Sequence, residues 1–264
     1  MSRAVWWSQD PRDQEWGKYD PTDTALLEKS YQGNKQPVVL DFGDAKFTVD
    51  VKKMTQNNNS GGSRPVKREE SKGPSGSMQK FTEQVCPKDS VAWTPELMKL
   101  LDIELAGTRP FLLAYLLACT SPWSAKKREV LDGFTDHHVE SVASCKKKLA
   151  ALEGKVKGSV EEFLKFMAFC FLFCRADEKA NYIALEDAVG YYKCLWALAP
   201  SSSQRVETLL DFMAANTKGI ISKDLWCQSA KFLLVVKADF SNYDEKDCYP
   251  LVIDDFVEHY RQKK

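Results

Sequence analysis

The spacing of hydrophobic residues changes partway along the chain, and this change limits the possible folds more than any other feature. Residues 37–54, PVVLDFGDAKFTVDVKKM, alternate apolar and polar side chains and predict two strands joined by a turn at Gly43. After Ser77, apolar residues recur at helical spacing to the end of the chain. Between these regions, residues 57–77 are rich in Gly, Ser, Asn and Pro, a composition too poor in apolar side chains to form a packed element. The sequence therefore predicts two domains of different class, joined flexibly.

The expected boundaries follow from helix and linker signals. Residues 1–68 are predicted to form a small α+β unit, because the helical run 23–32 begins after Pro21 and ends before a Gly-Asn pair. A flexible linker is predicted over residues 69–79. Residues 80–264 are predicted to form an all-α domain, whose central helix contains five phenylalanines at 163, 166, 169, 171 and 173.

Overall charge and hydropathy argue against several partners. The 37 basic and 37 acidic residues give no net charge, which argues against bulk electrostatic binding of nucleic acid or an anionic membrane. The N-terminal sequence lacks the apolar core of a signal peptide, and no apolar run reaches the ~18–20 residues of a membrane span. We therefore expect no nucleic-acid or membrane partner and a cytoplasmic and nuclear location.

The sequence offers no catalytic or metal-binding motif. Its eight cysteines include no CxxC pair, so we expect buried, reduced thiols rather than disulfides or a zinc site. A calcium loop beginning at Asp177 would place Lys179 and Ala188 at ligand positions, which excludes an ordinary EF-hand site. The pair His137–His138 lacks metal-ligand spacing. We expect no cofactor, no metal and no catalytic residue.

The first unit contains polar groups suited to a nucleotide diphosphate. An amide at Gln56 leaves the second predicted strand, and Arg64 follows on a polar loop together with Lys67 and Arg68. Guanidinium groups pair with phosphate, aromatic rings stack on bases, and an amide can read the edge of a ribose or adenine. The unit is also rich in aromatic residues, many of which a small core requires: Trp6, Trp7, Trp16, Tyr19, Tyr31, Phe42 and Phe47.

The pattern W-x(9)-W-x-x-YDP, followed by FTVDVKKMTQ and RPVKR, resembles a WWE domain over residues 4–68. The resemblance implies that Trp6 or Trp7, with Trp16 and Glu28, are the residues after which the fold is named. It also implies a site for ADP-ribose or iso-ADP-ribose at the open end of a half-barrel. The implied contact residues are Tyr19, Phe47, Gln56 and Arg64.

Two functions stay open for this unit. Family members that bind poly(ADP-ribose) often have tyrosine where this chain has Phe47, and the missing hydrogen bond is worth about 0.5–1.5 kcal/mol. The unit can therefore bind ADP-ribose groups on proteins, or it can act only as a protein-interaction module, as some family members do.

The C-terminal region carries a local excess of acid in a neutral chain. Seven carboxylates lie between Asp239 and Glu258, against one lysine, Lys246. Such a segment is either a solvated acidic face or a docking site for a basic partner, and its charge alone does not separate these interpretations.

The strings KGIISKDLW and SNYDEKDCYPLVIDDFVEHYR resemble the potentiating-neddylation domain of the defective-in-cullin-neddylation family, over about residues 80–262. The resemblance implies two calcium-free, EF-hand-like helical lobes. It implies a scaffold-type E3 that binds the cullin C-terminal region and the N-terminus of the neddylation E2, whose own cysteine performs the transfer. The implied cullin-binding residues are Asp224, Cys248 and Asp254, with Cys248 in place of the family's alanine and Tyr249 in place of its usual tryptophan.

The implied E2 pocket differs more from the family. Its residues are Leu113, Leu116, Phe173 and Cys194, and the last replaces the usual leucine. The smaller side chain weakens an apolar pocket by about 1–2 kcal/mol. One hypothesis is therefore a neddylation scaffold that recruits ADP-ribosylated proteins. The alternative is a cullin-binding adaptor with a degenerate E2 pocket and a protein-binding WWE domain. A hydrolase of ADP-ribose would need catalytic residues that the sequence lacks.

Overall fold

The computed structural model describes residues 3–11, 14–19, 21–41, 46–58, 60–71, 74–201, 205–244 and 246–262. The chain divides into two compact units, Met1–Ser75 and Gly76–Lys264. The turn predicted at Gly43 lies outside the described residues.

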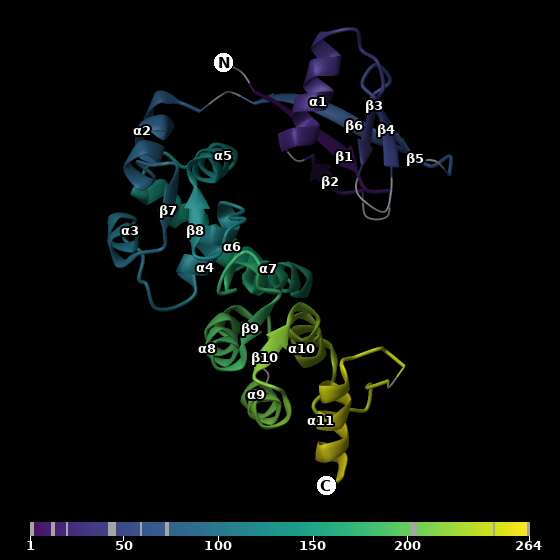
Figure 1. Ribbon diagram of the computed structural model, residues 1–264, viewed down its shortest axis with the longest axis vertical. Helices are drawn as coiled ribbons and strands as arrows, with labels where there is room; N and C mark the ends of the chain where they lie inside the picture. The colour runs from purple at the N-terminus through teal and green to yellow at the C-terminus, as the bar shows by residue number, and fades with distance from the viewer. Residues whose placement is uncertain are drawn as a thin grey trace. The chain divides into compact units, whose positions relative to one another are not determined.

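The first unit is a six-stranded antiparallel sheet, curled into a half-barrel, with one helix packed against β1 and β3 (Figure 1). Its strand order is β2-β1-β6-β5-β4-β3. The elements are β1 (Arg3–Gln9), β2 (Trp16–Lys18), α1 (Pro21–Gln32), β3 (Val38–Asp41), β4 (Lys46–Asp50), β5 (Thr55–Asn58) and β6 (Ser63–Ser71). The predicted α+β class is confirmed.

Local sequence signals set the limits of α1. Pro21 occupies its first position, where a fixed φ favours the helix and no N–H is needed. After Gln32 the N–H of Lys35, at φ 55°, donates to the Ser30 carbonyl over 2.9 Å and caps the C-terminus. Leu27, fully buried, then faces the sheet.

The second unit is helical and contains paired helix–loop–helix elements. The first group comprises α2 (Gly76–Val85), β7 (Ser90–Ala92), α3 (Pro95–Leu100), α4 (Arg109–Leu116), β8 (Ser124–Lys126) and α5 (Lys127–His137). The long α6 (Val142–Gly158) follows. The second group comprises α7 (Val160–Phe173), β9 (Tyr182–Ala184), α8 (Leu185–Leu195), η1 (Trp196–Leu198), α9 (Arg205–Asn216), β10 (Ile220–Ser222), α10 (Lys223–Val235) and α11 (Leu251–Gln262).

Short antiparallel ribbons, β7 with β8 and β9 with β10, join the loops within each group. Paired loops of this kind are typical of EF-hand-like lobes, and the predicted helical class is confirmed. One detail differs from an all-α domain, because residues 124–126 form the short strand β8. Their pairing with residues 90–92 is a tertiary interaction that outweighs local helix propensity.

The phenylalanine-rich helix lies at the centre of the second unit, as predicted. α7 packs against α4, α6 and α10 (Figure 1). Phe163, Phe166 and Phe173 are at most 1% exposed, whereas Phe169 is only partly buried. Ser159 caps the helix by accepting a hydrogen bond from the Glu162 N–H over 3.3 Å.

The predicted linker of residues 69–79 needs correction at both ends. Residues 69–71 extend β6 and pair with residues 3–5 of β1. Residues 76–79 begin α2, whose Met78 and Phe81 are buried. Composition alone missed both, since a partner strand and a partner core supply the stability that the polar segment lacks.

In the loop between α7 and β9, the side chain of Arg175 donates hydrogen bonds to backbone carbonyl groups. The Arg175 guanidinium donates to the carbonyls of Leu172, Glu178 and Ala180 over 3.0, 3.2 and 2.9 Å. Asp177 accepts hydrogen bonds from the N–H groups of Lys179 and Ala180 and so serves as a turn residue.

Among the described residues, no group of histidine, cysteine and acidic side chains could hold a metal ion. None of the helices in those residues is long and apolar enough to span a bilayer.

Candidate functional site

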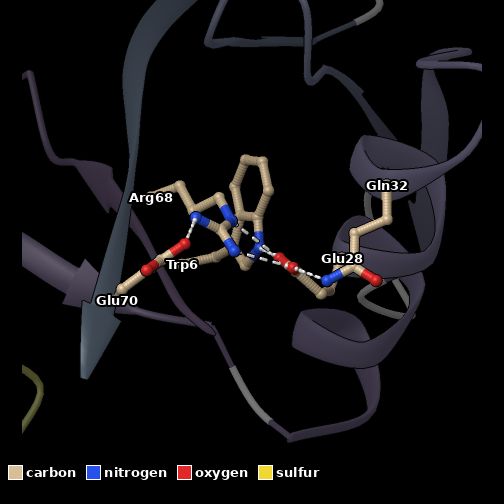
Figure 2. Close-up of polar contacts among 5 residues, drawn as sticks. All are labelled: Trp6, Glu28, Gln32, Arg68 and Glu70. Carbon is tan, nitrogen blue, oxygen red and sulfur yellow. Dashed lines mark hydrogen bonds and ion pairs between the residues drawn. The ribbon is translucent and has the colours of Figure 1, made fainter. Parts of the chain in front are cut away.

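A partly buried carboxylate, that of Glu28, joins three elements of the first unit (Figure 2). Glu28 Oε2 accepts from Trp6 Nε1 over 3.0 Å and from Arg68 Nε over 2.9 Å, while Oε1 accepts from Arg68 Nη2 over 2.8 Å and from Gln32 Nε2 over 2.6 Å. Hydrogen bonding from Arg68 is the main cause that lowers the pKa of Glu28. The cluster connects α1 to β1 and β6, so we assign Trp6 and Glu28 a structural role.

The basic residues of β6 lie on different faces of the sheet, because side chains alternate along a strand. Arg64 and Arg68 lie on one face, because residues two apart in a strand share a face. Lys67 lies on the other, with its Nζ 5.4 Å from the Trp7 ring and 4.6 Å from the Trp16 ring. Of the three basic residues that the sequence grouped together, Arg68 binds Glu28, and Arg64 lines a cavity in the first unit.

That cavity measures about 290 Å³ and brings together three of the four predicted ADP-ribose residues. Gln56 pairs directly with Arg64 across β5 and β6, and Phe47 pairs with Asn58 across β4 and β5. These pairings place the side chains on one face of the sheet. The lining residues are Pro11, Phe47, Gln56, Asn58, Gly62, Ser63 and Arg64.

The fourth predicted residue, Tyr19, lies behind the cavity wall. Its side chain is buried, and its hydroxyl donates to Gln56 Oε1. Burial raises the pKa of Tyr19 to about 12, so the phenol stays protonated and remains a donor at neutral pH.

Two buried donors of the wall have no hydrogen-bond partner within the described part of the chain. They are Gln56 Nε2, on a side chain 1% exposed, and Arg64 Nε. A buried donor without an acceptor costs about 1–3 kcal/mol, which an acceptor on a ligand would recover. The Arg64 guanidinium carbon also lies 5.4 Å from the centre of the Phe47 ring.

The loop between β5 and β6 completes the cavity, and the sequence analysis did not assign it to the site. Asn58 Oδ1 accepts the N–H groups of Ser60 and Gly62 over 3.1 and 2.6 Å. Gly61 has φ +84°, and a Cβ on Gly62 would lie 2.9 Å from Asn58 Nδ2. The run NNNSGG was the available signal, since Asn and Gly favour such turns.

The three predicted cullin-binding residues occupy different settings in the second unit. Asp254, in the first turn of α11, is partly buried and accepts a hydrogen bond from the Tyr243 hydroxyl. Cys248 is exposed at φ 53° in the preceding loop. Asp224 is exposed in the first turn of α10.

Tyr249, which follows Cys248, packs against the C-terminal half of α10, away from Asp224. The Tyr249 ring centre lies 5.8 Å from that of Phe232, and Lys231 Nζ lies 5.9 Å from the Tyr249 ring. Two helical turns, about 10 Å along the axis, separate Asp224 from Lys231. No hydrogen bond or ion pair among the described residues joins Asp224 to Cys248 or Asp254.

A cavity of about 450 Å³ lies along α11, and its lining includes three carboxylates. The lining residues are Tyr243, Leu251, Asp254, Asp255, Val257, Glu258 and Arg261. Leu251 is 73% exposed and lies next to these charges. The sequence signalled the charges, whereas Leu251 and Tyr243 were not predicted to take part.

The predicted E2-pocket residues belong mostly to the core. Leu113, Leu116 and Phe173 are at most 5% exposed. Phe173 contacts the rings of Trp93 and Trp123 at centroid distances of 5.4 and 5.1 Å. These tryptophans are only partly buried, so they, rather than the predicted leucines, give this cluster its accessible surface.

Cys194 is partly buried on α8. Burial raises its pKa, and a hydrogen bond from the Gly107 backbone opposes this effect. Cys194 packs against the same hydrophobic cluster that contains Leu113, Leu116 and Phe173.

Each unit contains a region that matches a known protein family. Residues 4–68 match the family model of the WWE domain, and residues 144–259 match the one described as cullin binding. DCN1-like protein 2 of Dictyostelium discoideum is 27% identical over 58% of this chain and 56% of its own length. Defective in cullin neddylation protein 1 of Mycosarcoma maydis is 30% identical over 50% of this chain and 43% of its own length. The protein of that name from Cryptococcus neoformans is 27% identical over 70% of this chain and 75% of its own length.

The chain therefore carries a WWE domain followed by a cullin-binding domain, and its helical unit is similar to the defective-in-cullin-neddylation proteins. It spans about half the length of the first two relatives.

Proposed function

We propose that the helical unit binds the C-terminal region of a cullin and promotes its neddylation as a scaffold, with no catalytic residue of its own. The match of residues 144–259 to the cullin-binding family carries this proposal. The names of the relatives, defective in cullin neddylation, support the process.

Charge supports the same partner. Asp255 and Glu258 are exposed on α11, next to Asp254 and the exposed Leu251. A basic protein surface with an apolar side chain complements this face, since charge complementarity speeds encounter and fixes orientation. Asp224 would add a carboxylate from α10, and Cys248 would lie at the edge of the interface.

Binding of purified full chain to a cullin C-terminal region, measured by isothermal titration, tests the proposal. We expect saturable binding that weakens with salt, and faster modifier transfer to the cullin in a reconstituted reaction containing the neddylation E2. Absence of binding at low salt would contradict the cullin assignment. Binding without faster transfer would favour the adaptor with a degenerate E2 pocket, a form that the burial of Leu113, Leu116 and Phe173 already supports.

For the WWE domain we propose binding of ADP-ribose groups, and hence recruitment of ADP-ribosylated proteins. The unpartnered donors of Gln56 and Arg64 in one cavity are the observation that favours this function over a protein-interaction module. Titration of the full chain with ADP-ribose and iso-ADP-ribose tests it. No heat at millimolar ligand would favour the protein-interaction function.

A further inference from the structure

The carboxylate of Asp254 is held from one side by the side chain of Tyr243. The Tyr243 hydroxyl donates a hydrogen bond to Asp254 Oδ1. A carboxylate only accepts hydrogen bonds, so the hydroxyl is the donor and this pairing has a single sense. Asp255 and Glu258 line the same cavity along α11 and are exposed, whereas Asp254 is partly buried. Of these three carboxylates, Asp254 is therefore the one that a buried phenol holds.

The position of Tyr243 is fixed by aromatic packing. Its side chain is 9% exposed, and its ring is stacked on that of Tyr249 at a centroid distance of 5.6 Å. The ring also meets the fully buried Phe232 of α10 edge to face, at 6.0 Å. Aromatic pairs in these two geometries attract one another beyond simple burial. The hydroxyl therefore occupies a fixed point, and the hydrogen bond holds Asp254 against it.

Holding this carboxylate has two consequences for a partner. An aspartate at a surface samples several rotamers, and a partner that binds it must immobilise it at a cost in free energy. A partner that covers the cavity also removes water from the carboxylate, and an oxygen left without a donor there would be costly. Tyr243 reduces both costs, because it orders the side chain beforehand and supplies a donor that stays in place.

One effect of the same hydrogen bond acts in the opposite direction. A donor draws some negative charge from the carboxylate, which weakens its attraction for a cation. A neutral phenol draws only part of the charge, whereas an unsatisfied carboxylate oxygen under a partner incurs its full desolvation penalty. The contribution to order and desolvation therefore outweighs the loss of charge.

We infer that Tyr243 is a positioning residue of the cullin interface, which holds Asp254 in the orientation that a basic side chain of the partner meets. This inference rests on the proposed cullin-binding function. The cavity is lined by three carboxylates and by one cation, Arg261, whose guanidinium carbon lies 5.7 Å from the Tyr243 ring. Negative charge thus remains for a partner after the chain's own cation is counted, and charge complementarity fixes the orientation of a basic surface.

Titration of the full-length Tyr243→Phe variant with a cullin C-terminal region tests the positioning role. Phenylalanine keeps the stacked ring and removes only the hydroxyl. We expect an affinity about two- to tenfold below wild type, the range for ordering one side chain at an interface.

Tyr260→Phe is the matched control. Its ring lies 4.9 Å from that of Phe256 in the same aromatic core, and it does not belong to the described lining of the cavity. The affinity of this variant should equal that of wild type. Equal losses in Tyr243→Phe and Tyr260→Phe would indicate general loosening of the core and would overturn the inference.

A double-mutant cycle separates positioning from a structural effect. In an Asp254→Ala background, Tyr243→Phe should cause no further loss of affinity, because Tyr243 acts through the carboxylate. Tyr243→Phe also leaves every charge in place, so its salt dependence should equal that of wild type, whereas Asp254→Asn should bind with a weaker salt dependence. Equal losses from Tyr243→Phe in both backgrounds, or no loss in either, would contradict the inference.

Asp254→Glu tests position at constant charge. Glutamate keeps the carboxylate but moves it one methylene farther from α11, away from the point that the Tyr243 hydroxyl fixes. We expect an affinity at least threefold below wild type with an unchanged salt dependence. If Asp254→Glu binds as tightly as wild type, charge alone is sufficient and the positioning role is wrong.

The same titrations distinguish failure of this inference from failure of the proposed function. If wild type does not bind the cullin C-terminal region at low salt, the proposed function fails together with the inference. If wild type binds and Tyr243→Phe binds equally well, only the inference fails.

Discussion

The two candidate sites use polar groups in opposite ways. In the WWE domain the polar atoms are buried donors in a concave cavity, and two of them have no partner among the described residues. In the cullin-binding domain Asp224, Asp255 and Glu258 are exposed to water, whereas Asp254 is partly buried and accepts a hydrogen bond from the Tyr243 hydroxyl. A buried donor without a partner carries information about its ligand, because it is costly unless an acceptor arrives. An exposed carboxylate has no such cost, so only its pattern and the family match point to a partner.

The largest expected effect is the loss of ADP-ribose affinity when the cavity residue Arg64 is replaced. Arg64→Ala should weaken ADP-ribose binding about 10- to 100-fold in titration, because charge-assisted hydrogen bonds to phosphate contribute roughly 1.5–3 kcal/mol. Gln56→Ala should weaken it less. Lys67→Ala is the matched control, since this neighbouring cation lies on the opposite face of β6. If Lys67→Ala lowers affinity as much as Arg64→Ala, the cavity is not the binding site.

The second-largest expected effect concerns two carboxylates of the cullin-binding domain, the exposed Asp224 and the partly buried Asp254. Asp254→Asn combined with Asp224→Ala should lower cullin affinity tenfold or more, because removing one side of a partly desolvated charge pair is costly. Wild-type binding should also weaken between ~50 and ~500 mM salt, where the Debye length falls below ~5 Å.

Asp244→Asn is the control for that double variant. Asp244 Oδ1 accepts the Lys246 N–H over 2.9 Å, as a turn residue does, and asparagine keeps this acceptor. Its cullin affinity should remain that of wild type. If the double variant binds cullin as tightly as wild type and the affinity of the wild-type complex does not depend on salt, the acidic segment is a solvated surface and not a docking site.

A smaller effect concerns the stability of the WWE domain in acid. The folded-state pKa of Glu28 is lowered, mainly by Arg68, so its stabilisation is present above the unfolded-state value of about 4.5. That contribution is lost as the pH falls through the folded-state pKa. Glu28→Gln should lower the unfolding midpoint at pH 7 and flatten its dependence on pH between about 5 and 3. Glu70→Gln, which removes a more exposed partner of Arg68, should change both much less.

The smallest expected effect concerns the thiols. Burial raises the pKa of Cys86 and raises that of Cys145 to about 11, which disfavours a thiolate nucleophile. Serine at Cys86, Cys145 or Cys248 should leave cullin neddylation within a few-fold of wild type. A reducible thioester between the modifier and this chain would instead make it an enzyme.

Much of the fold could be predicted from the sequence, because the local sequence signals and the tertiary structure favour the same elements. The helix α1, the central position of α7 and the division into an α+β and a helical unit followed from periodicity and capping. Strand β8 and the ends of the predicted linker did not, because their pairing partners lie far along the chain. Sequence also grouped Arg64 with Lys67 and Arg68, and only strand register separated them.

The sequence by itself determined which chemical groups each site contains: an amide and a guanidinium near aromatic rings, and a run of carboxylates beside a short loop. The tertiary structure decided how those groups are used. It placed Tyr19 behind Gln56 instead of in the cavity, covered the Phe47 ring with Arg64, and bound Asp254 to Tyr243. The physical reason is that composition fixes hydrogen-bonding capacity, whereas burial and register decide which donors and acceptors are already paired and which remain for a ligand.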